Sequence, residues 1–364
     1  MRTALRVLRK PVSAAACAAA IAVMSVAGCA GSLTPTGAGG ASPGSQPDFS
    51  YFKGKTITYD VVQPPGGTFY VAAQILAPVV AKYLHATVNV VSVPAGNGVA
   101  GQDQVATSAP DGLTVGTLNL GVDLENQLTN TPSINFDLKK ITIVAGLPIN
   151  PDVFITAPNS PYKTWNDVID SKTSIKSLDY AGPVDEVQQV LFGAYQTPVN
   201  LIQGYTSSAD EVAGFLRGDG PVALQSSTAV SSAIAAGKAR PLLVTGPVYP
   251  GSQGYDQLKN LQTLASFYAS DKPTTASGNA AVKELIALFG AESPNQTIFA
   301  APGTPASLTN ALTAAFKYAL AQPTTRTKEL QQALTPGYYS PAVVVSLISG
   351  FEKNVGLMKQ YVKS

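Results

Sequence analysis

Apolar and polar positions along the chain alternate between the two-residue period of β-strands and the longer period of helices. Residues 56–62 are β-branched and aromatic, which is typical of a strand. Residues 70–84 repeat apolar side chains at helical spacing. A strand at 87–93, a helix at about 98–108 and a strand at 113–118 continue the alternation. Three short strands joined by helical crossovers predict a parallel sheet of βαβ units.

A second set of alternating elements follows. Thr164 and Asp167 are spaced as a capping box, and Pro305 and Pro341 stand where a first helical turn tolerates proline. Residues 247–295 are rich in Pro, Gly, Ser and Tyr and give no clear period. The remaining predicted strands are 153–156, 175–180, 199–202, 222–224 and 240–245, and the predicted helices between them are 162–169, 184–195, 208–217 and 226–236. The pattern predicts an α/β protein.

The N-terminus has the features of an export signal. Residues 2–10 are basic, residues 12–26 are apolar and rich in alanine, and small residues lead to Cys29. This order resembles the bacterial lipobox, in which the cysteine is acylated and becomes the new N-terminus. We expect a lipoprotein signal peptide at 1–28 and lipidation of Cys29. The alternative is an ordinary signal with a chance cysteine.

The segment after Cys29 predicts a flexible tether. Residues 30–47 are small, polar or proline and have no charge, so they cannot bury enough surface to fold. The only other cysteine, Cys17, lies inside the predicted signal, so no disulfide is expected in the folded body. No later stretch reaches the length of apolar sequence that a transmembrane helix needs.

Charge argues against a nucleic-acid-binding protein. The 364-residue chain has 24 basic and 22 acidic side chains, but four of the basic residues lie in the predicted signal. The rest of the chain is therefore slightly acidic, whereas a nucleic-acid interface needs a dense basic field. The 45% of apolar residues can bury a large core, and the length suggests two domains.

The sequence also argues against an enzyme. His85 is the only histidine, and no thiol nucleophile remains once Cys29 is lipidated. No nucleophile elbow, zinc-ligand pair or phosphate-binding loop is found. We therefore expect no catalytic residue, no metal and no cofactor.

Six short segments, in the same order, resemble those of the Bordetella uptake gene (Bug) family, the solute receptors of tripartite tricarboxylate transporters. They are residues 63–67 (QPPGG), 94–101 (PAGNGVAG), 109–114 (APDGLT), 159–164 (NSPYKT), 236–240 (AGKAR) and 300–305 (AAPGTP). Each segment alone is weak, but together they run through nearly the whole body.

The resemblance implies a two-lobed type II periplasmic-binding-protein (Venus flytrap) fold with a hinge between the lobes. The implied division is a tether at 29–48, a first lobe at 49–146, a second lobe at 147–246, and a return to the first lobe with C-terminal helices at 247–364. Binding in the family rests on main-chain N–H groups at helix starts, which suit a carboxylate.

Carried over by position, the family's ligand-binding loops fall on four segments of this chain. The implied ligand-binding residues are Pro65, Gly66, Gly67, Thr68, Phe69 and Tyr70 in the first lobe, and Gly182, Pro183, Val184, Asp185, Tyr205, Thr206, Ser207, Gln225, Ser226 and Ser227 in the second.

Two departures from the family pattern leave the ligand open. The family often has Asp where Tyr70 stands, and Asp185 would repel a carboxylate unless it faces away. Phe69 and Tyr70 could form a stacking wall, so an aromatic acid, a monocarboxylate or a neutral polar solute is as compatible as a dicarboxylate.

Several of the implied ligand-binding residues also have a purely structural interpretation. Tyr70 could face the core, Asp185 could complement a helix dipole, and Ser226 could belong to an N-cap cluster. The usual basic candidates for an anion are Arg217, Lys238 and Arg240, and they are better explained as solvated.

The resemblance implies capture of a small, carboxylate-bearing solute for integral membrane transporter subunits. We expect a monomer that is anchored by lipid on the extracytoplasmic face of the cell membrane and binds no nucleic acid. The alternatives are a solute-sensing or scaffolding lipoprotein without a dedicated transporter, and the receptor of an ABC importer.

Overall fold

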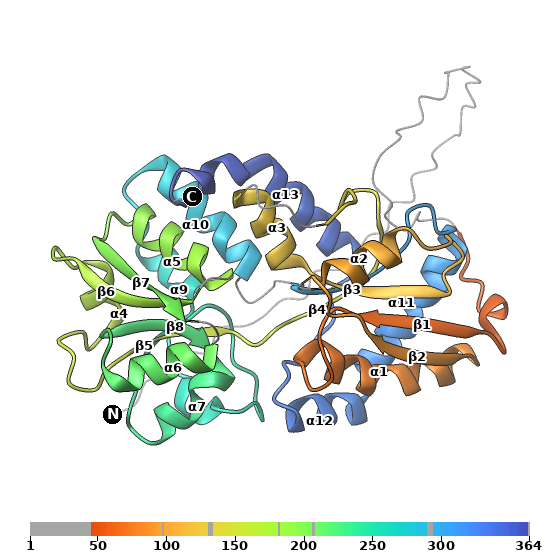
Figure 1. The fold of residues 1–364 in the computed structure, drawn as a ribbon, viewed down its shortest axis with the longest axis horizontal. Helices are drawn as coiled ribbons and strands as arrows, with labels where there is room; N and C mark the ends of the chain where they lie inside the picture. Colours follow the sequence, from red (N-terminus) through yellow and green to blue (C-terminus); the bar gives the residue numbers. More distant parts are fainter. Residues whose placement is uncertain are drawn as a thin grey trace, which may run out of the picture. The chain divides into compact units, whose positions relative to one another are not determined.

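Two five-stranded sheets form the framework of the chain (Figure 1). The structure, a computed structural model, describes residues 45–362 apart from 97, 130–133, 181–182, 206–207 and 290–293. The first sheet has the strand order β2-β1-β3-β10-β4, and the second has the order β7-β6-β8-β5-β9.

The first sheet begins with the three parallel strands that the sequence predicts. These are β1 (Thr56–Val61), β2 (Thr87–Ser92) and β3 (Thr114–Asn119), with β1 paired to both neighbours. The sheet is completed by β4 (Thr142–Leu147) and β10 (Gln296–Ala300), and β10 runs antiparallel between β3 and β4. A strand from far along the chain therefore joins the first sheet.

Six helices follow or flank the strands of the first sheet. They are α1 (Thr68–Leu84), α2 (Val99–Ala106), α3 (Leu120–Thr129), α11 (Ala306–Ala321), α12 (Pro323–Gln331) and α13 (Pro341–Lys359). Helix α1 packs on α11, and the fully buried Tyr59 and Phe316 rings meet edge to face with centroids 5.6 Å apart. A short 3₁₀ helix (Ser50–Phe52) precedes β1 and buries Phe52 in the same core.

The second sheet contains β5 (Asp152–Thr156), β6 (Ile175–Tyr180), β7 (Val199–Tyr205), β8 (Val222–Ser226) and β9 (Arg240–Val244). Strand β6 runs parallel to β7 and β8, whereas β5 runs antiparallel to β8 and β9. Each sheet thus has one antiparallel strand set among parallel ones.

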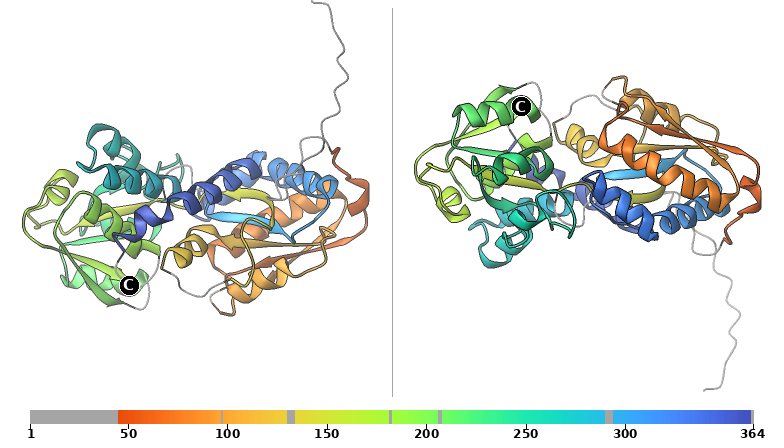
Figure 2. Two further views of the ribbon diagram at one scale, coloured as in Figure 1. Left: turned by 90° about the horizontal axis from the view of Figure 1, so that it is seen from above. Right: turned by 90° about the horizontal axis from the view of Figure 1, so that it is seen from below.

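The helices that accompany the second sheet continue along the sequence well beyond its last strand, β9. They are α4 (Trp165–Ile169), α5 (Pro183–Ala194), α6 (Ser208–Arg217), α7 (Ser227–Ala235), α8 (Tyr255–Leu258), α9 (Leu264–Ser270) and α10 (Ala276–Phe289). The Trp165 ring lies against Phe154 of β5, with centroids 4.4 Å apart, and Phe267 of α9 meets Trp165 edge to face. Helix α13 packs on α10, α3 and β4 and so connects helices of both sheets (Figure 2).

Most of the predicted elements are confirmed within two or three residues, including the Thr164–Asp167 capping box. The pattern did not predict β4, β10, α3 or α12, nor the helices α8, α9 and α10 in the segment 247–295, which gave no clear period. Every residue of β4 and β10 is buried, so neither strand shows the alternation that marks a half-buried strand. The expected return to the first lobe at 247 differs from the observed packing, because α9 packs on Trp165 and the chain rejoins the first sheet only at β10.

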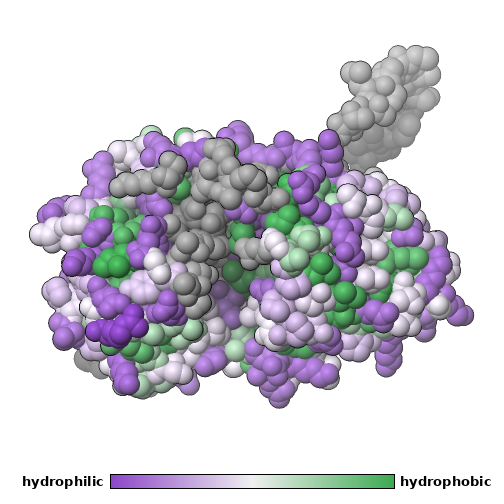
Figure 3. Space-filling model, in the orientation of Figure 1, coloured by the Kyte–Doolittle hydropathy of each residue, from purple (hydrophilic) through white to green (hydrophobic). Residues whose placement is uncertain are grey.

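Among the coloured atoms of the face in Figure 3, hydrophobic residues are interspersed with hydrophilic ones. Within the described ranges, no helix is both long enough and apolar enough to cross a bilayer.

Candidate functional site

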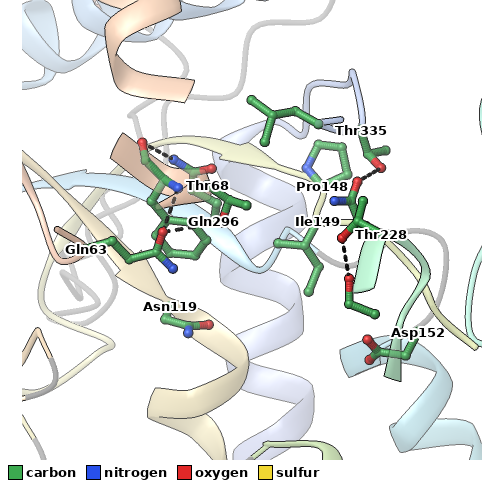
Figure 4. A pocket seen from close by; sticks show the side chains of 13 residues that line it. Gln63, Thr68, Asn119, Pro148, Ile149, Asp152, Thr228, Gln296 and Thr335 are labelled. Carbon is green, nitrogen blue, oxygen red and sulfur yellow. Dashed lines mark hydrogen bonds between the residues drawn. The ribbon is translucent and has the colours of Figure 1, made fainter. Parts of the chain in front are cut away.

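A pocket of about 220 Å³ is lined by residues from both sheets and from the segment that joins them (Figure 4). Its volume is below the roughly 300–1,000 Å³ of drug-sized sites, which suits a metabolite-sized ligand. The lining residues are Gln63, Thr68, Phe69, Asn119, Pro148, Ile149, Asn150, Asp152, Ser226, Thr228, Gln296, Leu334 and Thr335.

On the first-sheet side, the side chain of Gln63 organises the start of α1. Its Oε1 accepts a hydrogen bond from the Phe69 N–H at 2.8 Å and from the Thr68 hydroxyl at 3.3 Å. Gln63 thereby replaces a capping side chain, because the N-cap residue is Gly67. Gly66 supports the turn with a φ of +93°, which favours glycine.

Asn119 and Gln296 complete this side of the pocket. Asn119 ends β3 and directly precedes α3, so its position marks the start of a second helix. Gln296 begins β10 and is buried, and its Nε2 donates to the Phe69 carbonyl at 3.5 Å. The strand ends of the first sheet therefore supply amide groups to the pocket.

The connection from β4 to β5 is tied to the segment after α12. Asn150 donates from Nδ2 to the Ala333 carbonyl at 2.8 Å and accepts from the Thr335 hydroxyl at 2.9 Å. These two bonds hold Leu334 and Thr335 beside Pro148 and Ile149 at the pocket wall.

On the second-sheet side, Asp152, Ser226 and Thr228 line the pocket. Ser226 is the N-cap residue of α7, and its hydroxyl lies 2.8 Å from that of Thr228. Asp152 begins β5 and pairs with Ser226 across the antiparallel ladder. Burial raises the pKa of the Asp152 carboxyl to about 7.

Three helices begin at lining residues: α1 at Thr68, α3 after Asn119, and α7 after Ser226. A helix start presents N–H donors and roughly half a positive charge, so this arrangement can hold an anion. One leading N–H of each helix already donates within the protein: Phe69 to Gln63 Oε1, Leu120 to the Asn295 carbonyl and Ser227 to the Pro151 carbonyl, so the other N–H groups of the first turns are the ones available. Among the described lining residues there is no Lys, Arg or His. An anion in this pocket would be held by main-chain N–H groups, side-chain amides and hydroxyls.

The first-lobe residues implied by the resemblance fall into three groups. Thr68 and Phe69 line the pocket, whereas Pro65, Gly66 and Gly67 form the loop just before α1. Tyr70 is half-buried and packs against the core of the first sheet, which favours its structural interpretation.

Of the second-lobe residues, Ser226 lines the pocket, and Gln225 and Ser227 support it. Gln225 is buried, donates to Glu211 Oε2 at 2.7 Å and accepts from the Ser208 hydroxyl. The buried Ser227 donates its N–H to the Pro151 carbonyl at 2.9 Å. These contacts fix the end of β8 against the start of β5.

Of the remaining implied residues, Tyr205 lies away from the pocket lining, three form the first turn of a helix, and the others lie outside the described part of the chain. Tyr205 donates from its hydroxyl to Asp219 Oδ2 at 3.0 Å and is not a lining residue. Pro183, Val184 and Asp185 form the first turn of α5. Gly182, Thr206, Ser207 and Cys29 lie outside the described residues.

The two arginine candidates have partners away from the pocket. Arg217 pairs with Asp219 at 2.9 Å, and Arg240 donates to the Pro158 carbonyl at 3.0 Å. Neither residue lines the pocket.

Sequence reasoning missed Asn119, Asn150, Asp152, Gln296 and Thr335. The signal for Asn119 was present, because ligands of α/β proteins gather at the carboxyl ends of parallel strands and Asn119 ends β3. The others reach the pocket through antiparallel pairing or through contacts between distant segments, which a local pattern does not show.

Several solved structures share this fold. A TctC solute-binding protein from Polaromonas is 16% identical with a TM-score of 0.66, and the match covers 84% of this chain and 98% of that one. MatC from Rhodopseudomonas palustris with bound malate is 18% identical, with a TM-score of 0.55 and coverage of 84% and 99%. A second R. palustris protein, with adipate, is 18% identical, with a TM-score of 0.55 and coverage of 84% and 97%. The expected two-lobed periplasmic-binding fold is confirmed.

Sequence comparison identifies the family. No curated protein matches the chain. The sequence profile described as "Tripartite tricarboxylate transporter family receptor" matches residues 72–353, which is most of the described structure. The chain therefore belongs to the tripartite tricarboxylate transporter receptor family.

Proposed function

We propose that this protein captures a small carboxylate-bearing solute outside the cytoplasm and passes it to the membrane subunits of a tripartite tricarboxylate-type transporter. The observation that supports this most directly is the convergence of three helix starts on one small pocket whose described lining has no basic side chain. Main-chain N–H groups at helix starts suit a carboxylate without a counter-cation. We expect capture without turnover.

The chemistry of two structural neighbours agrees with this proposal. One contains malate and the other adipate, both of which are small aliphatic carboxylates. Phe69 is the only aromatic side chain among the described lining residues, but it is 3% exposed and belongs to the core of the first sheet, on which Tyr70 also packs. The rings expected to form a stacking wall for an aromatic acid are thus engaged in the core, and aliphatic carboxylates become the first to test.

A melting-temperature screen of the purified protein against small carboxylates, neutral solutes and cations tests this function. A ligand at a hundredfold excess over its Kd stabilises the folded state by about 2.7 kcal/mol. For a body of this size that corresponds to roughly 5–10 °C in melting temperature. We expect carboxylates to give this shift, and calorimetry would confirm direct binding. A screen in which only solutes without a carboxylate raise the melting temperature would contradict the proposal.

We also propose that the protein is a lipoprotein anchored through Cys29, on the evidence of the signal-like N-terminus. Cys29→Ala should either release the protein from membranes or leave it attached by an uncleaved signal. Stable anchoring needs two or more acyl chains, because one chain binds a bilayer only marginally. Detergent partitioning and N-terminal mass measurement check this, and a processed Cys29→Ala protein that partitions like the wild type would exclude the lipid anchor.

A further inference from the structure

Asp152 is the one ionisable side chain among the described residues that line the pocket. The other lining side chains are amides, hydroxyls and apolar groups. In Figure 4 the Asp152 carboxylate points toward the side of the cavity on which Asn119 lies. Its backbone N–H donates to Thr245 Oγ1 at 2.9 Å, but no hydrogen bond or ion pair to its carboxylate is found within the described ranges. Within the part of the chain that the structure describes, the Asp152 carboxylate therefore faces the pocket without a protein partner.

The elements packed on β5 supply no compensating charge near Asp152. Strand β8 and helix α7 have no titratable residue. The only titratable residue of β9 is Arg240, which pairs with Thr156 at the other end of β5. Burial without a neighbouring cation is why the pKa of the Asp152 carboxyl rises to about 7.

The two sides of the pocket thus differ in charge. On the first-sheet side, α1 begins at Thr68 with no acidic residue in its first turn. On the second-sheet side, the negative charge of Asp152 offsets the partial positive charge at the start of α7, because Asp152 pairs with the α7 N-cap residue Ser226. A carboxylate group is favoured at the start of α1, whereas a second carboxylate near α7 would meet a like charge.

We propose that Asp152 is a specificity-determining residue that selects a solute bearing a cationic nitrogen, such as an ammonium group, in addition to its carboxylate. The proposal rests on the proposed function, since it assumes that a carboxylate is held at the start of α1. The ligand class is then a small amino-carboxylate oriented with its carboxylate toward the first sheet and its ammonium group toward Asp152. Such a solute places a group of opposite charge on each side of the pocket, whereas a dicarboxylate places a like charge beside Asp152.

Matched probes of equal length test this inference. Calorimetry of the purified protein would compare succinate, glutarate and adipate with 4-aminobutanoate, 5-aminopentanoate and 6-aminohexanoate, in which an aminomethyl group (CH2–NH3+) replaces one carboxylate and the number of carbon atoms is unchanged. At about pH 8, where Asp152 is ionised, we expect the amino acid of the best-fitting length to bind at least about tenfold more tightly than the dicarboxylate of the same length. This is the loss of affinity that removal of one charged hydrogen-bond partner typically causes. Lowering the pH to about 6 protonates Asp152 and should narrow this preference.

Asp152→Asn preserves the shape of the side chain and removes its charge. We expect this variant to lose the preference for amino acids, to bind dicarboxylates more tightly, and to show no change in preference between the two pH values. Glu284→Gln is the matched control, because Glu284 is also buried with a raised pKa but does not line the pocket. It should bind like the wild type.

Two unfavourable outcomes are distinguishable. If dicarboxylates bind more tightly than amino acids and Asp152→Asn leaves their affinity unchanged, Asp152 does not select the ligand, while carboxylate capture stands. If no probe with a carboxylate binds the wild type, both this inference and the proposed function are wrong.

Discussion

Replacement of Gly67 by valine is expected to weaken solute binding about 10- to 100-fold while the chain stays folded. A Cβ atom at Gly67 would lie 2.7 Å from Gln63 Oε1 and 2.8 Å from Gln63 Cβ, so the Gln63 side chain must move. That side chain accepts from Phe69 N–H and from Thr68 at the start of α1. Loss of one charge-assisted contact costs about 1.5–3 kcal/mol, which corresponds to the expected loss of affinity.

Gly356→Val is the matched control for this substitution. Gly356 lies in α13, where an added Cβ meets nothing within 4 Å, and it is not among the described residues that line the pocket. Calorimetric affinity and melting temperature would be measured for both variants. Normal binding by Gly67→Val together with loss of binding in Arg217→Ala or Arg240→Ala would mean that side-chain cations, and not the start of α1, hold the ligand.

Asp123→Asn is expected to stabilise the protein by about 2–4 kcal/mol at about pH 8 and to have little effect near pH 4. Asp123 is 2% exposed, and burial raises the pKa of its carboxyl to about 7, whereas an unfolded chain has a value of about 3.9. Between these values the folded state keeps the proton and the unfolded state releases it. The free energy of unfolding therefore falls as the pH rises through this window, and asparagine removes the penalty.

The existing hydrogen bond should survive this substitution. Gln102 donates from Nε2 to Asp123 Oδ2 at 3.0 Å, and the Asn side-chain oxygen can accept in the same way. Denaturant unfolding at the two pH values measures the effect. A variant that is destabilised equally at both would show that Asp123 is ionised and favourably paired in the folded protein.

The sequence predicted the parallel units of each sheet because their strands and helices differ clearly in period. Residues 56–62 and 70–84 change from one period to the other across a Pro- and Gly-rich turn, and the structure places β1 and α1 there. It did not predict β4 and β10, since both are buried throughout and read as short apolar runs. The antiparallel insertion of β10 depends on pairing with β3 and β4, which lie far earlier in the chain: Gln296 pairs with Asn119 on one side and with Leu147 on the other.

The lining residues of the pocket likewise divide into those that the sequence could predict and those that it could not. Thr68 and Ser226 could be predicted because each stands where a strand gives way to a helix, a position that the local pattern reveals. Asp152 could not, because its place beside Ser226 follows from antiparallel pairing of β5 with β8. Thr335 reaches the pocket through a hydrogen bond to Asn150 that spans 185 residues. The charge asymmetry of the pocket was therefore not predictable from the motifs.

Carboxylate capture at the start of α1 is tested most directly by a crystal structure of the protein purified from its native source with its solute retained, supported by mass spectrometry of that solute. We predict one small molecule in the pocket between Thr68 and Asp152, with a carboxylate oxygen at hydrogen-bond distance from the main-chain N–H groups at the start of α1. A solute without a carboxylate, or a carboxylate solute bound outside this pocket, would contradict this prediction.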